Sequence, residues 1–98
     1  MSGDWRPTAS LDLLRKRAAL LATMRSFFAA RGVLEVETPA VLSRTVTDVQ
    51  IESLRVDDGD AQRFLQTSPE YPMKRLLAAG SGDIYQICHV FRAGESGR

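Results

Sequence analysis

The sequence has almost no cysteine: Cys88 is the single one among 98 residues. One cysteine cannot form a disulfide within the chain, and together with its neighbour His89 it makes too small a set for a structural zinc site. We therefore expect a reduced, cytoplasmic setting and no bound metal ion. Cys88 itself is interpreted as a packed strand residue.

Long apolar runs and an excess of one charge are also absent. No stretch approaches the roughly 18 apolar residues of a membrane span, and the polar start, residues 1–7, does not resemble a secretory signal. The 13 basic and 12 acidic residues leave a net charge of +1. The sequence therefore indicates neither a membrane segment nor a strongly basic surface for nucleic acid.

The first long element should be a helix. After a tail of residues 1–10, helical periodicity predicts a helix over 11–31, with Ser10 as its N-cap and Gly32 as its stop. Its apolar positions form a wide stripe. They are Leu11, Leu14, Ala18, Leu20, Leu21, Met24, Phe27 and Phe28. A stripe this wide in so small a chain predicts a second surface that covers it, such as a second copy of the protein.

The remaining sequence is typical of strands with one short helix inserted. We expect extended segments at 33–39, 49–56 and 63–66, a polar loop at 42–48, turns at 57–60 and 68–71, a helix at 72–79 and a strong final strand at 84–92. The helix is placed from Pro72 onward because the residue before a proline is biased away from helical angles. A long helix followed by strands predicts an α+β fold in one domain.

Two polar features stand where chemistry could use them. The first is Ser68-Pro69-Glu70 at the entrance of the short helix, a pattern that helix capping explains as well. The second is Arg92 at the end of an apolar strand, on the same strand face as Gln86. Two polar side chains on one face suggest a ligand surface, although an exposed strand end would also account for them.

Three blocks of sequence resemble class II aminoacyl-tRNA synthetases of the lysyl type. Residues 28–39, FAARGVLEVETP, are similar to motif 1, a long helix followed by a strand with a proline. Residues 64–80, FLQTSPEYPMKRLLAAG, resemble the segment that enters motif 2, and residues 84–92, IYQICHVFR, resemble the motif 2 strand with its Phe-Arg ending. The three blocks come in the family's order, which makes their agreement more specific than any one block.

The resemblance implies a partial catalytic domain over residues 11–98, with motif 1 at about 11–39 and the start of motif 2 at about 64–98. Its fold would be the N-terminal part of an antiparallel sheet with flanking helices. The family continues into the rest of motif 2 and into motif 3, which supplies a second ATP-binding arginine. We therefore expect residues 1–98 by themselves to be incomplete and inactive.

The resemblance also implies roles for single residues. Glu70 would hold an amino group of a lysine-type substrate, because a carboxylate makes a charge-assisted hydrogen bond to an ammonium group. Ser68, Pro69 and Gln86 would shape the same substrate pocket. Arg92 would be the catalytic residue that bridges the attacking carboxylate and the α-phosphate of ATP, which arrives with Mg²⁺.

Two further implications concern ATP and assembly. The family usually reads Phe-Arg-x-Glu, with that glutamate contacting adenine, whereas here the glutamate comes one place later. Ala93, Gly94 and Glu95 are therefore ATP-binding candidates beside Arg92, with a solvated loop charge as the alternative for the glutamate. Motif 1 builds the dimer in this family, so Pro39 is expected at or beside the contact of a homodimer.

The string TSPEYPMKRLL at 67–77 favours one branch of this family. Aspartyl and asparaginyl enzymes carry glutamine after Ser-Pro, and tRNA-charging lysyl enzymes usually carry alanine before Pro-Glu. Ser-Pro-Glu resembles the branch that attaches β-lysine to elongation factor P. About ten residues precede the first helix, which leaves no room for the anticodon-binding barrel of a tRNA-charging enzyme.

The expected function is ATP-dependent activation of lysine or β-lysine and its transfer to a lysine side chain of elongation factor P. tRNA is the less favoured acceptor. Two alternatives stay open at this point. One is a lysyl-tRNA synthetase that lacks its anticodon domain. The other is a non-catalytic interaction module that keeps the motif 1 dimer surface.

Overall fold

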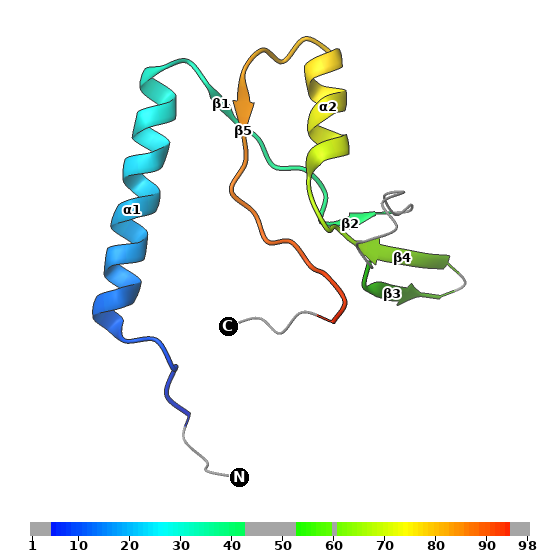
Figure 1. The fold of residues 1–98 in the computed structure, drawn as a ribbon, viewed down its shortest axis with the longest axis horizontal. Coiled ribbons are helices and arrows are strands. Elements are labelled where there is room, and N and C mark those ends of the chain that lie inside the picture. Colours follow the sequence, from blue (N-terminus) through cyan, green and yellow to red (C-terminus); the bar gives the residue numbers. More distant parts are fainter. Residues whose placement is uncertain (1–4, 43–52, 60, 95–98) are drawn as a thin grey trace.

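The computed structural model describes residues 5–42, 53–59 and 61–94, and its elements follow an α+β order (Figure 1). In chain order they are α1 (Leu11–Ala30), β1 (Leu34–Glu35), β2 (Val41–Leu42), β3 (Arg55–Asp58), β4 (Ala61–Leu65), α2 (Glu70–Ala78) and β5 (Ile84–Tyr85). The predictions for the loop and strand within 43–52, and for Asp60 and Glu95, fall outside the described residues.

Helix α1 begins where the sequence predicted. The Ser10 side-chain oxygen accepts a hydrogen bond from the Leu13 backbone N–H at 3.1 Å, which satisfies one of the free donors of the first turn. The helix ends at Ala30, and Gly32 follows with a φ of 72°, a left-handed conformation that a residue without Cβ adopts readily. Both helix boundaries therefore come from local sequence.

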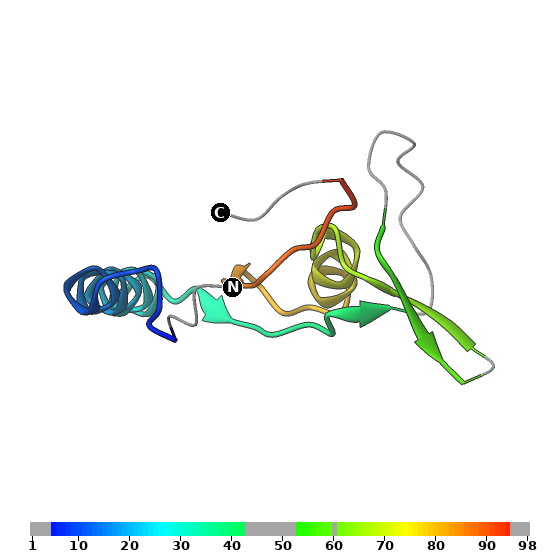
Figure 2. The ribbon, with the colours of Figure 1, turned by 90° about the horizontal axis from the view of Figure 1, so that it is seen from below.

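The apolar stripe of α1 is largely uncovered in the described part of the chain. The helix has no buried residue, and only Leu21 and Phe28 are half-buried. Leu20 and Phe27 of the stripe are 60% and 49% exposed, and Leu13 on the same side of the helix is 56% exposed. Figures 1 and 2 show α1 at one edge of the molecule, with the three-stranded sheet at the opposite edge.

The strands form two separate sheets. β1 pairs in parallel with β5, in the register Leu34 with Ile84 and Glu35 with Tyr85. β2, β4 and β3 form a three-stranded antiparallel sheet in that order, and Gly59, with a φ of 58°, turns the chain between β3 and β4. The antiparallel sheet expected from the sequence is thus present in part, together with a parallel pair.

The strong strand expected over 84–92 is wrong beyond Tyr85. The ladder with β1 continues as far as the Val36 N–H, which donates to the Tyr85 carbonyl at 3.0 Å. The next inward donor, Thr38 N–H, binds the side-chain oxygen of Gln86 instead of a backbone carbonyl. Because this side chain takes the place of a backbone acceptor, β1 and the segment after β5 separate and regular pairing stops.

Helix α2 begins at Glu70, which corrects the expected start at Pro72. The first helical hydrogen bond runs from Met73 N–H to the Pro69 carbonyl at 3.1 Å. Pro72 lies within the first turn, where a backbone N–H has no partner inside the helix, so its missing donor costs nothing there. Tyr71 is helical although it precedes that proline, because a first-turn proline fits the helical φ.

The described segments do not enclose an apolar core. No hydrophobic side chain among them is fully buried, and the buried residues are Gln66 and Thr67, each 2% exposed. The radius of gyration is 17.1 Å, whereas a compact domain of about this length has about 13 Å. Cys88, expected to be packed in a strand, is exposed and lies beyond β5. No helix within the described ranges combines the length and hydropathy needed to cross a bilayer.

Candidate active site

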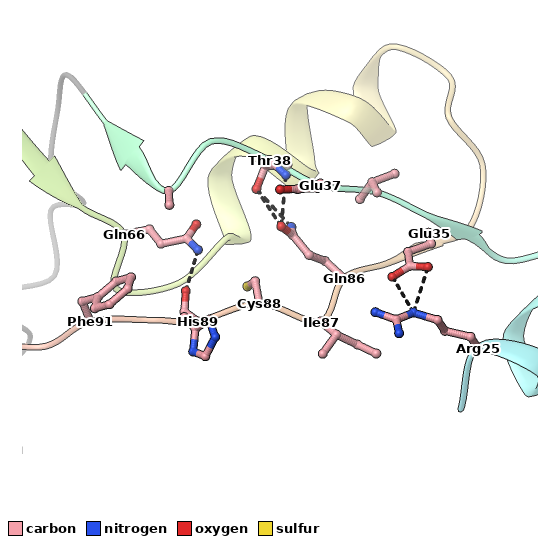
Figure 3. A pocket seen from close by; sticks show the side chains of 12 residues that line it. Arg25, Glu35, Glu37, Thr38, Gln66, Gln86, Ile87, Cys88, His89 and Phe91 are labelled. Carbon is pink, nitrogen blue, oxygen red and sulfur yellow. Dashed lines mark hydrogen bonds and ion pairs between the residues drawn. The ribbon is translucent and has the colours of Figure 1, made fainter. Parts of the chain in front are cut away.

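A pocket of about 570 Å³ lies between two extended segments, residues 35–40 after α1 and residues 86–91 after β5 (Figure 3). Its lining combines charged, amide and apolar side chains. The lining residues are Arg25, Glu35, Val36, Glu37, Thr38, Ala40, Gln66, Gln86, Ile87, Cys88, His89 and Phe91. Among the residues predicted to bind substrate, Gln86 lines this pocket, whereas Ser68, Pro69 and Glu70 do not.

Gln86 turns its amide onto Thr38 across this pocket (Figure 3). Its Oε1 accepts from the Thr38 backbone N–H at 3.0 Å and from the Thr38 hydroxyl at 3.3 Å. Its Nε2 donates to the Thr38 Oγ1 at 3.0 Å. Since residue 86 is outside β5, the prediction that Gln86 and Arg92 share one strand face does not hold.

Gln66 joins the pocket to the motif 2 segment. Its backbone N–H donates to the Ala40 carbonyl at 2.9 Å, and its backbone carbonyl accepts from the Phe91 N–H at 2.8 Å. Its side-chain Nε2 donates to the His89 carbonyl at 2.7 Å, as the dashed line in Figure 3 shows. The end of β4 is therefore attached to both extended segments.

The Ser68-Pro69-Glu70 turn opens α2. Pro69 occupies the N-cap position without a side-chain capping bond, and the Ser68 Oγ accepts from the Glu70 backbone N–H at 3.3 Å. The Glu70 carboxylate, 60% exposed, forms an ion pair with Lys74 one helical turn later, with Oε1 and Nζ 2.8 Å apart. The hydrogen bond and the charge of Glu70 raise the pKa of Lys74 above its usual range. In this structure the Glu70 carboxylate is thus paired with a lysine of its own helix.

Arg92 lies next to this turn. Its Nη2 is 3.5 Å from the carbonyl oxygen of Thr67, the residue before Ser68. Its side chain is exposed, and the following Ala93 is half-buried. Gly94 has a φ of 81°, which turns the chain there. The Arg92 guanidinium thus lies near the residue that precedes the Ser68-Pro69-Glu70 turn.

Contacts between α1 and β1–β5 fix the far side of the pocket. The Arg25 Nε lies 3.0 Å and 3.2 Å from the two carboxylate oxygens of Glu35, and Phe28 stacks on Tyr85 with ring centroids 4.2 Å apart. Partial burial, followed by the neighbouring Glu35 carboxylate, raises the pKa of the Tyr85 phenol above 10.0. These contacts anchor the motif 1 helix to the strand that leads to Arg92.

Sequence reasoning missed Gln66, Thr38 and the Arg25–Glu35 pair. The signal for Gln66 was its place directly after an apolar strand end and directly before the Thr67-Ser68-Pro69 run. The partner of Gln86 is 48 residues away in the chain, and no local pattern predicts such a contact. Within the described residues, no group of His, Cys, Asp and Glu side chains is arranged to ligate a metal ion.

Sequence comparison identifies the class of protein. The chain belongs to the family described as tRNA synthetases class II (D, K and N), which matches residues 3–98. This confirms the resemblance drawn from the three sequence blocks.

Individual relatives are more specific. The chain is 55% identical over 104 residues to the "Elongation factor P--(R)-beta-lysine ligase" of Vibrio vulnificus, covering 100% of this chain and 32% of that protein. The proteins of the same name from Photobacterium profundum and Erwinia tasmaniensis are 50% and 55% identical, over 100% and 99% of this chain and 32% of each relative. The chain therefore spans about a third of the length of the curated relatives it matches.

Proposed function

We propose that the protein to which these residues belong is an ATP-dependent ligase acting on elongation factor P in the cytoplasm. It would activate lysine or β-lysine and transfer it to a lysine side chain of that acceptor. The observation that supports this best is the contact between Arg92 and the Thr67 carbonyl, which sets a guanidinium beside the Ser68-Pro69-Glu70 turn. The names of the relatives support the choice of acceptor.

In the first step, a carboxylate oxygen of the amino acid attacks the α-phosphorus of ATP. The bond from that phosphorus to the bridging oxygen breaks, and pyrophosphate leaves. Mg²⁺ bound to the phosphates of ATP would offset part of their negative charge. Negative charge gathers on the α-phosphate during the attack. The Arg92 guanidinium, which is planar and always charged, would stabilise that charge and orient the carboxylate.

Glu70 would bind the amino group of the substrate in the same step. A carboxylate makes a charge-assisted hydrogen bond to an ammonium group, and the substrate ammonium would replace the exposed Lys74 that now lies 2.8 Å away. Ser68, which accepts from the Glu70 backbone, would fix the turn that carries this carboxylate. Ala93, Gly94 and Glu95 would lie near the adenine or phosphates of ATP.

In the second step, an uncharged lysine amine of the acceptor protein attacks the acyl carbon. A new amide bond forms, AMP leaves, and the amine proton passes to solvent. Catalysis in both steps rests on positioning and electrostatic stabilisation, which together contribute several kcal/mol. A homodimer with Pro39 at or beside its contact would complete the assembly.

The test offers both acceptors to the whole protein. Elongation factor P and tRNA are incubated with ATP and radiolabelled lysine or β-lysine in the same buffer. We expect labelled elongation factor P, more with β-lysine than with lysine, and negligible labelling of tRNA. Labelled tRNA with unlabelled elongation factor P would instead support a lysyl-tRNA synthetase. Absence of pyrophosphate exchange with either amino acid would support a non-catalytic module.

A further inference from the structure

Gln66 lies in one of the three sequence blocks that resemble the family, and it bonds to a second block and to the residue that follows the third. Its backbone N–H reaches Ala40, directly after the motif 1 block, and its backbone carbonyl and side chain reach Phe91 and His89 in the segment after β5. Gln66 itself stands two residues before Ser68 and is 2% exposed. One buried residue therefore sets the separation of the three segments.

The backbone bonds of Gln66 would form with almost any residue at that position, so the side chain contributes the bond to His89. This bond, at 2.7 Å, and the Phe91 N–H bond, at 2.8 Å, hold residues 89–91 at both ends. Arg92 follows directly, and its guanidinium lies beside the Thr67 carbonyl. The direction in which the Arg92 side chain points from the backbone thus depends on the Gln66 carboxamide.

Stability alone does not explain a carboxamide at this site. The Gln66 Oε1 is buried and has no hydrogen-bond partner among the described residues. A buried acceptor without a partner lowers stability, and an apolar side chain of the same length would avoid that cost. The carboxamide does supply the donor of the hydrogen bond to the His89 carbonyl.

We propose that Gln66 is a positioning residue for Arg92, with its carboxamide holding residues 89–91 so that the guanidinium stays beside the Ser68-Pro69-Glu70 turn. The proposal rests on the proposed function, because it takes Arg92 as the group that meets the reacting phosphate. Its effect belongs to the rate of adenylate formation, since preorganised charge acts in the transition state. Binding of the amino acid, which depends on Glu70, should change little.

The experiment uses pyrophosphate exchange by the whole protein. Gln66→Met keeps the length and the burial of the side chain and removes the donor. We expect kcat to fall about tenfold with the KM for the amino acid within about twofold, and a melting temperature equal to or above that of the wild type. Gln62→Met, at an exposed position of the same strand β4, is the matched control and should leave all of these values unchanged.

A double-mutant cycle with Arg92→Ala separates this role from a general loss of packing. If Gln66 acts through Arg92, Gln66→Met should cause no further loss of rate in the Arg92→Ala background. Wild-type exchange by Arg92→Ala alone would refute the proposed site and not just the role of Gln66. The positioning role alone would be overturned if Arg92→Ala lowers the exchange rate while Gln66→Met leaves it normal, or if the rate losses of the two variants simply add. If Gln66→Met and Gln66→Leu both melt well below the wild type or fail to fold, the carboxamide is structural and the inference is wrong.

Discussion

Gln86 and Thr38 are joined side by side although 48 residues separate them in the chain. The Gln86 amide accepts from the Thr38 backbone N–H at 3.0 Å and donates to the Thr38 hydroxyl oxygen at 3.0 Å. Thr38 is followed by Pro39, the residue expected at the dimer contact, and Gln86 begins the segment that leads to Arg92. The pair therefore links the motif 1 segment to the motif 2 segment at the point where backbone pairing stops.

Breaking this pair should destabilise the protein. Gln86→Leu leaves the partly buried N–H and hydroxyl of Thr38 without their partner, so we expect a loss of about 1–3 kcal/mol in the free energy of unfolding. Gln86→Glu keeps an oxygen acceptor for both Thr38 donors and should lose less. Urea denaturation of the whole protein measures the difference. Equal stability of Gln86→Leu and wild type, combined with a raised KM for the amino acid, would instead favour the substrate-binding role of Gln86.

The side of α1 that carries Leu13, Leu20, Met24 and Phe27 should form the dimer contact. Leu13, Leu20, Met24 and Phe27 follow one another at spacings of seven, four and three residues and so share one side of the helix. In the whole protein we expect a two-fold homodimer, and Leu20→Glu should weaken the dimer by at least about tenfold because it places a charge in an apolar interface. Sedimentation at several protein concentrations measures this.

Ala22→Glu is the control for the dimer experiment, since it puts the same charge on the opposite side of α1, at a position that is also exposed. It should leave the dimer intact. A wild-type protein that sediments as a monomer at micromolar concentration would contradict the prediction, and so would equal weakening by both variants.

Arg92 and Glu70 should affect different kinetic constants. Arg92→Ala should lower the rate of pyrophosphate exchange by a factor of about 10² to 10³, or about 3–4 kcal/mol, because a preorganised charge is lost at the reacting centre. Glu70→Gln keeps the shape of the side chain and removes its charge. It should raise the KM for the amino acid about tenfold or more, since hydrogen bonds to charged groups contribute about 1.5–3 kcal/mol.

Asp12→Asn provides a control for the Glu70 variant. Asp12 also pairs with a lysine one helical turn later, since its Oδ2 lies 3.2 Å from the Lys16 Nζ, but it does so on α1 and not at the Ser68-Pro69-Glu70 turn. The variant removes the same charge from the same kind of exposed pair and should retain wild-type kinetic constants. Near-normal exchange by both Arg92→Ala and Glu70→Gln would contradict the assignment of the site.

Local sequence was sufficient where local physics decides the structure. The Ser10 cap, the stop at Gly32 and the existence of α2 all follow from side chains near the backbone groups that they satisfy. The bias before a proline predicts a start at Pro72, but α2 begins at Glu70, because the free N–H groups of the first turn make Pro72 acceptable there.

Long-range contacts were beyond the same reasoning. The apolar run that begins at Ile84 predicts a long strand. A strand continues only while a neighbouring strand pairs with it, and after Tyr85 the Thr38 N–H bonds to the Gln86 side chain instead of a backbone carbonyl. The expectation that Arg92 and the Ser68-Pro69-Glu70 turn belong to one site rests on the family resemblance. The residue that we propose positions Arg92, Gln66, has partners 26 and 23 residues away that no periodicity indicates.

Tyr85 should make the protein less stable at alkaline pH. Partial burial, and then the charge of Glu35, raise the pKa of its phenol above the ordinary 10.0. As the pH rises through about 10, the unfolded chain therefore releases this proton before the folded one does, and the free energy of unfolding falls until the pH passes the folded-state pKa. Tyr85→Phe has no proton to release there, so its stability should fall less between about pH 9 and about pH 11.

Tyr71→Phe, which changes a 51% exposed ring on α2, is the control and should keep the wild-type dependence of stability on pH in urea denaturation at both pH values. Parallel losses of stability in the wild type and Tyr85→Phe would show that the raised pKa of Tyr85 does not control the alkaline transition.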